Sequence, residues 1–216
     1  MSRAPTLCGV ILAAGESTRM GADKALLPWP PVAAGLPSAG QTFLSAAIRV
    51  LSAVNDFVVV VVGNNQPNLA PVVYAAGGSL VRNPAPERGQ FSSLQVGLQG
   101  VLSRGRDAAM ITLVDRPPLS AATLEKLCAA FAAATALGKW AVVPEYGGKH
   151  GHPILVGREM IEVFLKAPVT ATARDIEHQN QQHIEYIPVD DPFVALNVDT
   201  PQDYAALSSL AAAQTK

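Results

Sequence analysis

Four apolar runs of strand length recur along the chain, each free of the alternation with polar residues that marks a half-exposed strand. They cover residues 7–14, 57–62, 108–114 and 140–144. An unbroken apolar run of this length, rich in valine and isoleucine, predicts a strand that is covered on both faces. We therefore expect a buried sheet with helices packed on either side.

Helical patterns lie between these runs. Apolar residues recur at spacings of three and four within 43–51 and 124–131, which is typical of amphipathic helices. Ser92 followed by Gln95 fits a capping box, and TPQD at 200–203 offers a cap, a proline at the first helical position and an acid in the first turn. The alternation of strand and helix predicts a three-layer α/β/α fold with a mostly parallel sheet.

Composition limits the partners that the chain is expected to have. With 49% hydrophobic and 15% charged residues, residues 1–216 can bury a core as a single domain. The formal net charge of -1, with both signs scattered, predicts no binding to nucleic acid or to a membrane surface. Only Cys8 and Cys128 occur, without zinc-ligand spacing, and no signal segment or membrane span is apparent. We expect a cytoplasmic protein with a small-molecule partner.

Three polar or glycine-containing stretches follow predicted strands, at residues 15–24, 83–93 and 115–119. Ligands of open α/β sheets bind outside the carboxyl ends of the strands, so these stretches are predicted to meet at one cleft. The segment 28–40 contains four prolines and two glycines, which exclude a helix or a central strand. It is predicted to be a surface excursion, either an insertion or a lid.

The first of these stretches has the character of a phosphate-binding loop. Ala13, Ala14 and Gly15 leave room for backbone N–H groups to face oxygen atoms. Arg19 and Lys24 add positive charge beyond them. The stretch is neither a Walker loop nor a dinucleotide fingerprint. A turn with solvated basic residues is the alternative.

The whole string LAAGESTRMGADK, residues 12–24, resembles the LAAGxSxRMGxxK signature of nucleotidyltransferases related to molybdenum-cofactor guanylyl- and cytidylyltransferases. Four later stretches are similar to elements of that family in the same order: RGQFSSLQVGLQG (88–100), LVDRPPLS (113–120), GKHGHPILV (148–156) and LNVDTPQDY (196–204). The resemblance implies the Rossmann-like fold of nucleotide-diphospho-sugar transferases. It also implies Mg²⁺-dependent transfer of CMP from CTP to the phosphate of a molybdopterin-type cofactor, with release of pyrophosphate; GTP is the rival donor.

The same resemblance implies a role for each candidate site residue. Catalysis would fall to Lys24, Arg19 and Asp115. Nucleotide binding would fall to Leu12, Ala13, Ala14, Gly15, Lys24, Gly89, Ser92 and Ser93. The metal would be held by Asp115, Asp199 and Asn197, and the acceptor by His152 and Arg116. Arg116 departs from the Gln or Met that is usual after the metal-binding acid. Helix capping remains the competing explanation for Asp115, Asp199 and Ser92.

Three other functions stay open. One is a GTP-dependent guanylyltransferase, and another is a nucleotidyltransferase for sugar or polyol phosphates. The third is a non-catalytic accessory protein that binds nucleotide or cofactor for a molybdenum-containing enzyme. The joint presence of Lys24, Asp115 and Asp199 favours catalysis, because a carrier has little need to neutralise charge at a phosphate.

Overall fold

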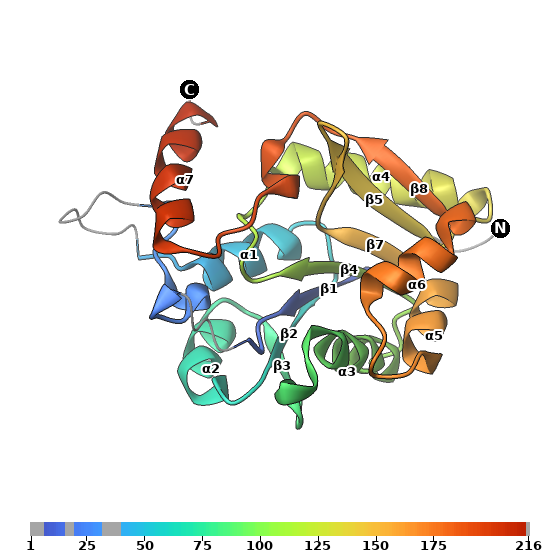
Figure 1. The fold of residues 1–216 in the computed structure, drawn as a ribbon, viewed down its shortest axis with the longest axis horizontal. Coiled ribbons are helices and arrows are strands. Elements are labelled where there is room, and N and C mark those ends of the chain that lie inside the picture. Colours follow the sequence, from blue (N-terminus) through green and yellow to red (C-terminus); the bar gives the residue numbers. More distant parts are fainter. Residues whose placement is uncertain (1–6, 16–19, 32–39, 215–216) are drawn as a thin grey trace.

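The structure, a computed structural model, describes residues 7–15, 20–31 and 40–214, with backbone alone for 208–214. Its described part is built on one eight-stranded sheet (Figure 1), in the order β3-β2-β1-β4-β7-β5-β6, with β8 paired to β5. The strands are β1 (Leu7–Leu12), β2 (Val58–Val62), β3 (Ser79–Arg82), β4 (Ala108–Leu113), β5 (Ala141–Tyr146), β6 (Lys149–His150), β7 (Ile154–Gly157) and β8 (Ile184–Pro188).

The four apolar runs form β1, β2, β4 and β5, so these strand predictions are confirmed. β3, β2, β1 and β4 run parallel to one another, and β8 runs parallel to β5. β7 is antiparallel to both β4 and β5, and it enters the sheet between them. The sheet is therefore mostly parallel but mixed, as in many large α/β sheets.

Seven α-helices of the described part surround the sheet (Figure 1): α1 (Phe43–Ser52), α2 (Gln66–Ala75), α3 (Gln90–Ser103), α4 (Ala121–Ala136), α5 (Arg158–Lys166), α6 (Ala173–Gln179) and α7 (Pro201–Gln214). Alternate strand residues face opposite sides. Ile11 joins a core built with α1, α2 and α4. Val10 and Leu12 join a second core built with α3, α5 and α6. The predicted three-layer α/β/α fold is confirmed.

The two predicted helix starts have different outcomes. The capping box at Ser92 is wrong, because α3 begins directly after Gly89, whose φ of 92° only glycine adopts readily. Ser92 lies inside the first turn and donates to the Gly89 carbonyl at 2.7 Å. Gln95 instead donates to the Phe164 carbonyl in α5 at 3.0 Å, and so it ties two helices together.

The start of α7 is as predicted. Thr200 Oγ1 accepts a hydrogen bond from the Asp203 amide at 3.2 Å. The Asp203 carboxylate accepts from the amides of Thr200 at 2.8 Å and Asp199 at 3.0 Å. These bonds, those of Thr200 first, hold the pKa of Asp203 below its usual value. The reciprocal pattern fixes the chain at Asp199.

The proline-rich excursion is pinned at its base. Pro28 and Thr42 form an antiparallel bridge, and the Trp29 amide donates to the Gln41 carbonyl at 2.9 Å. The Trp29 ring packs edge-on against Phe43, with ring centroids 5.0 Å apart. Residues 32–39 lie outside the described residues.

Two further observations concern the cysteines and the helices. Both cysteines are free thiols, and burial raises the pKa of Cys8 to about 12. Within the described ranges, none of the helices has the length and apolar character needed to cross a membrane.

Candidate functional site

Two adjoining cavities open at the carboxyl ends of β1 and β4. The first, which we call the glycine-loop cavity, has a volume of about 340 Å³. It is lined by Leu12, Ala14, Gly15, Lys24, Pro86, Gly89, Gln90, Ser93, Leu113, Val114 and Asp115. Each of the three polar stretches that follow predicted strands contributes to this lining. The prediction that they meet at one cleft is thus confirmed for the described residues.

A buried lysine at this cavity bridges two carboxylates from distant parts of the chain. Lys24 Nζ lies 2.6 Å from Asp199 Oδ1 and 3.7 Å from Asp115 Oδ2. The lysine is only 9% exposed, but the Asp199 side chain is 39% exposed and that of Asp115 24%, so water screens the pair with Asp199 more than the pair with Asp115. We call these three side chains the Lys24 cluster.

One backbone hydrogen bond and one side-chain hydrogen bond bring the two acids of the cluster together. Asp115 follows β4 and Asp199 precedes α7. The Val198 amide donates to the Asp115 carbonyl at 2.9 Å, and Arg116 Nη1 donates to the Leu196 carbonyl at 3.0 Å. The loop after β4 and the segment before α7 therefore run side by side.

Helix capping does not explain either acid. α4 begins after Ser120, whose hydroxyl accepts from the Thr123 amide at 3.2 Å. Thr200 caps α7. The Asp115 and Asp199 carboxylates face Lys24 instead, and the capping alternatives are wrong.

The electrostatics of Asp115 favour an added cation. Burial raises the pKa of this carboxyl group, Lys24 and Arg116 oppose the rise, and Asp199 adds to it. Asp115 Oδ1 is buried and has no hydrogen-bond partner among the described residues. Hard carboxylate oxygens of this kind suit Mg²⁺, which takes one or two carboxylates together with phosphates and water. Asp115 and Asp199, which both lie within 4 Å of Lys24, supply two such carboxylates. In the described part, no group of three or more His, Cys, Asp or Glu side chains that could hold a metal occurs.

The glycine loop is placed partly as expected. Leu12, Ala14 and Gly15 line the cavity. Ala13 lies beneath it: its amide donates to the Val61 carbonyl at 2.8 Å, and its carbonyl accepts from Asn65 at 2.9 Å. Its main-chain groups are thus occupied inside the protein, contrary to the prediction that they face a ligand. Arg19 lies outside the described residues.

The two serines at the start of α3 differ in their surroundings. Asn83 Nδ2 donates to Ser92 Oγ and to Ser93 Oγ, both at 2.9 Å. The Ser92 hydroxyl in turn donates a hydrogen bond to the Gly89 carbonyl. Ser93 lines the glycine-loop cavity and Ser92 does not. Ser92 therefore stabilises the turn, which corrects the expectation that it binds a ligand.

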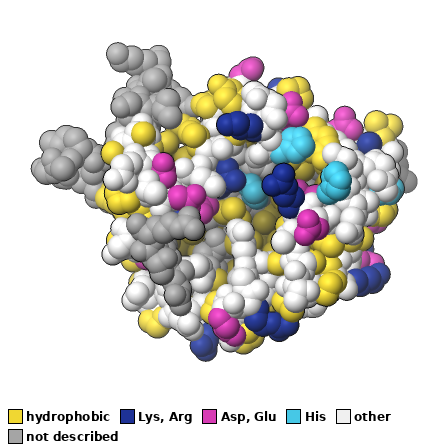
Figure 2. All heavy atoms as spheres, in the orientation of Figure 1, with side chains coloured by type: hydrophobic (Ala, Val, Ile, Leu, Met, Phe, Trp, Pro, Cys, Tyr) yellow, Lys and Arg dark blue, Asp and Glu magenta, His cyan; other side chains and the backbone are white. Residues whose placement is uncertain are grey.

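The second cavity, which we call the α6 cavity, has a volume of about 640 Å³. Arg116, His152 and Asn197 line it, together with residues of α6. Asn197 thus lies beside the predicted acceptor residues, and it is exposed. Figure 2 shows Lys, Arg and His side chains gathered around the middle of this face.

The two histidines of the GKHGHP stretch point to different places. Burial and then Arg116 lower the pKa of His152 to about 3, so this side chain is neutral in the α6 cavity. Its Nδ1 is buried without a hydrogen-bond partner among the described residues. His150 is exposed, lies 3.6 Å from Glu145, and stacks on Tyr186 with ring centroids 4.2 Å apart.

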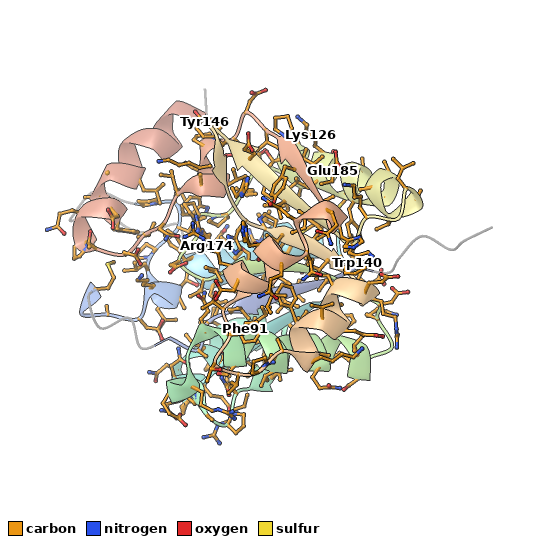
Figure 3. All side chains as sticks on the ribbon, turned by 45° about the vertical axis from the view of Figure 1, so that its right-hand side comes forward. Phe91, Lys126, Trp140, Tyr146, Arg174 and Glu185 are labelled. Atoms are coloured by element: carbon orange, nitrogen blue, oxygen red, sulfur yellow. The ribbon has the colours of Figure 1, made fainter. Side chains whose placement is uncertain are left out.

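Several lining residues escaped the sequence analysis. Arg174 and Glu177 of α6 line the α6 cavity together with Phe91 of α3; Figure 3 labels Arg174 and Phe91 on these two helices. Burial raises the pKa of Glu177 to about 7. Nothing in the polar sequence of α6 marks these residues. Asn83, directly after β3, begins the stretch 83–93 that was already placed at a strand end, whereas Asn65, in the loop after β2, was not singled out. Neither of them lines the two cavities.

A mostly parallel α/β sheet with a glycine loop and a charged cluster at the carboxyl ends of its strands is typical of nucleotide-binding α/β proteins. Residues 9–185 match the model of the MobA-like NTP transferase domain. The chain therefore belongs to this family, and the predicted family and fold class are confirmed.

Known proteins support this assignment. The chain is 37% identical to a molybdenum cofactor guanylyltransferase of Xanthomonas euvesicatoria over 123 residues, 56% of this chain and 53% of the relative. It thus spans about half the length of such curated guanylyltransferases. A molybdenum cofactor cytidylyltransferase of Escherichia coli is 22% identical over 90% of this chain and 92% of the relative. The crystal structure of Rv0371c from Mycobacterium tuberculosis is similar with a TM-score of 0.76 and 26% identity, covering 94% of this chain and 98% of that one.

Proposed function

We propose that this protein is a metal-dependent nucleotidyltransferase that transfers a nucleoside monophosphate to the phosphate of a molybdopterin-type cofactor and releases pyrophosphate. The observation that carries the proposal is the Lys24 cluster at the glycine-loop cavity, with Lys24 Nζ within 4 Å of both acids. Transfer brings an anionic acceptor onto the α-phosphorus of a triphosphate, so the site must neutralise several like charges. We assign the reaction to one cytoplasmic domain.

The three side chains of the cluster divide this work. Asp115 and Asp199 hold a divalent cation, which neutralises phosphate charge when it is bound. Lys24, which lies beside both carboxylates, would stabilise charge on the triphosphate as the bond breaks. Arg19 adds a second positive charge to the phosphates. Asp115 Oδ1, which is buried and has no hydrogen-bond partner in the part of the chain that the structure describes, supports its role as a metal ligand.

The nucleotide lies against backbone and short side chains. Leu12, Ala14, Gly15, Gly89 and Ser93 line the cavity in which it would bind. The Ser93 oxygen accepts from Asn83, so its hydroxyl proton is directed by that bond toward another acceptor. We therefore expect the Ser93 hydroxyl to donate a hydrogen bond to the nucleotide.

The acceptor binds in the α6 cavity. Leu12, Gly89, Gln90 and Leu113 line both cavities, so a donor in one and an acceptor in the other share a wall. Arg116 brings a fixed positive charge for the acceptor phosphate. Neutral His152 lines the same space without adding charge.

The donor is CTP or GTP. The sequence elements favour CTP, whereas the guanylyltransferases among the relatives favour GTP. We take Mg²⁺ as the metal and include Mn²⁺ in the test, because Rv0371c has also been solved in complex with manganese. A molybdenum-containing enzyme is the proposed recipient of the product.

Pyrophosphate release tests the proposal. The protein is incubated with each triphosphate, Mg²⁺ or Mn²⁺, and either molybdopterin cofactor or a sugar phosphate. We expect release with one triphosphate and the molybdopterin acceptor, loss of release on chelation, and loss in Asp115→Ala. The matched control is Asp190→Ala, an exposed acid outside both cavities. Release with the sugar phosphate but not with molybdopterin cofactor would contradict the proposed acceptor and favour a sugar-phosphate nucleotidyltransferase. No release with any combination of triphosphate and acceptor would favour an accessory protein.

A further inference from the structure

Asn65 lies where the chain leaves β2 and enters α2, and its side chain makes three hydrogen bonds. Oδ1 accepts from the Gly63 amide at 3.1 Å. Nδ2 donates to the Ala13 carbonyl at 2.9 Å and to Asp23 Oδ2 at 3.1 Å. Both amide protons and the amide oxygen are in use. The orientation is fixed, because only the oxygen can accept from the Gly63 amide.

These bonds do not serve the helix that Asn65 begins. It is the N-cap residue of α2, yet its side chain makes no capping bond there. An asparagine at this position ordinarily accepts from an amide of the first turn and stabilises its helix. Here the side chain is turned toward the glycine loop and Asp23 instead.

Asp23 extends the contact to the lysine of the cluster. Its Oδ1 accepts from the Ala25 amide at 3.0 Å and so caps the short 3-10 helix η2 (Lys24–Leu26). Its Oδ2 is the atom that Asn65 holds. Because the two oxygens have different partners, the carboxylate cannot rotate without losing one of them. The start of η2, and with it Lys24, depends on Asn65 for its position.

The same amide therefore touches two parts of the candidate site. One donated proton fixes Ala13, whose neighbours Leu12 and Ala14 line the glycine-loop cavity. The other fixes Asp23, next to the lysine that contacts Asp199 at 2.6 Å. We infer that Asn65 is a positioning residue for nucleotidyl transfer. It holds the nucleotide-binding loop and Lys24 at a fixed position relative to each other. This inference rests on the function proposed above.

Asn65→Asp is the informative substitution. It keeps the shape of the side chain and the acceptor for Gly63, but it sets a carboxylate against the Ala13 carbonyl and the Asp23 carboxylate. Displacement of catalytic groups by about 1 Å costs up to about a hundredfold in rate, so kcat should fall roughly tenfold to a hundredfold. Adding Asp23→Asn restores a donor between the two side chains and should recover part of kcat. A merely structural role predicts no such rescue.

Asn64→Asp is the matched control. Asn64 is the adjacent residue, it is exposed, and its substitution changes the net charge equally. Its kcat should equal that of the wild type. Asn65→Ala removes the same bonds without new charge, and it takes the place of Asn65→Asp if that variant fails to fold.

A second readout separates this inference from the proposed function. Lys24 is nearly buried, and its rate of acetylation by a succinimidyl ester, followed by peptide mass spectrometry, reports how firmly it is held. The rate should rise several-fold in Asn65→Asp and stay unchanged in Asn64→Asp. A wild type that releases no pyrophosphate refutes the proposed function, while the labelling still tests the positioning. Two results would overturn the inference. One is a rate of Lys24 acetylation in Asn65→Asp that equals the wild-type rate, and the other is a lower Tm of Asn65→Asp with unchanged kcat.

Discussion

The most quantitative prediction concerns Glu177 in the α6 cavity. Burial raises the pKa of this carboxyl group from 4.5 to about 7. Below pH 4.5 the group is neutral in both the folded and the unfolded chain. As the pH rises toward 7, the unfolded chain releases the proton while the folded chain keeps it, so the free energy of unfolding falls. The loss is complete above the folded-state pKa.

The size of the effect follows from the two pKa values. A difference of one in pKa corresponds to about 1.4 kcal/mol, so the rise from 4.5 to about 7 corresponds to about 3 kcal/mol of unfolding free energy. Glu177→Gln is neutral throughout and escapes this loss. Relative to the wild type, the variant should therefore gain about 3 kcal/mol between about pH 4.5 and about pH 8.5, or roughly 6–12 °C in Tm.

Urea denaturation at a series of pH values measures this difference. Glu125→Gln is the control, because Glu125 is exposed on α4, and its difference from the wild type should be the same at both ends of the series. A difference between Glu177→Gln and the wild type that does not change with pH would refute the reasoning that burial penalises the Glu177 carboxylate.

Two further predictions concern backbone approach and the serines of α3. A Cβ added at Gly151 would press against the Val194 carbonyl, so Gly151→Ala should lower the free energy of unfolding by about 1–3 kcal/mol, and an unchanged urea midpoint would contradict the close contact. Ser92→Ala should lower the free energy of unfolding by about 1 kcal/mol, because the Gly89 carbonyl loses the hydrogen bond that Ser92 donates to it in the first turn of α3. Ser93→Ala should instead raise KM for the triphosphate about fivefold. Urea denaturation and steady-state kinetics measure the two effects. A raised KM in Ser92→Ala together with a loss of stability in Ser93→Ala would contradict these roles.

The buried strands could be predicted because burial on both faces leaves an unbroken apolar run in the sequence. β7 carries the same signal over only four buried residues, ILVG, directly after the GKHGHP stretch. Its pairing with β4 and β5 places it in the sheet. The start of α3 was predicted at the wrong residue, because Ser92 followed three residues later by Gln95 is typical of a capping box. The helix begins directly after Gly89 instead. Local patterns do not contain such tertiary constraints.

The candidate site divides in the same way. Lys24 and Asp115 could be selected from strand ends, and a lysine and an acid there suggest phosphate chemistry. The contact of Lys24 with Asp199 spans 175 positions of the chain and depends on the backbone bond that joins Val198 to Asp115. Glu177 gains its shifted pKa from burial alone, and burial of one glutamate on a short polar helix leaves no mark in the sequence.

The central claim is that Lys24, Asp115 and Asp199 act together on a metal-bound triphosphate. A crystal structure with the triphosphate and Mg²⁺ tests it most directly. We expect the cation at about 2.0–2.1 Å from carboxylate oxygens of Asp115 and Asp199, with Lys24 Nζ on the phosphates and the base against Ala14 and Gly15. A triphosphate bound elsewhere, or a cation held away from both carboxylates while Lys24 keeps its contact with Asp199, would contradict it.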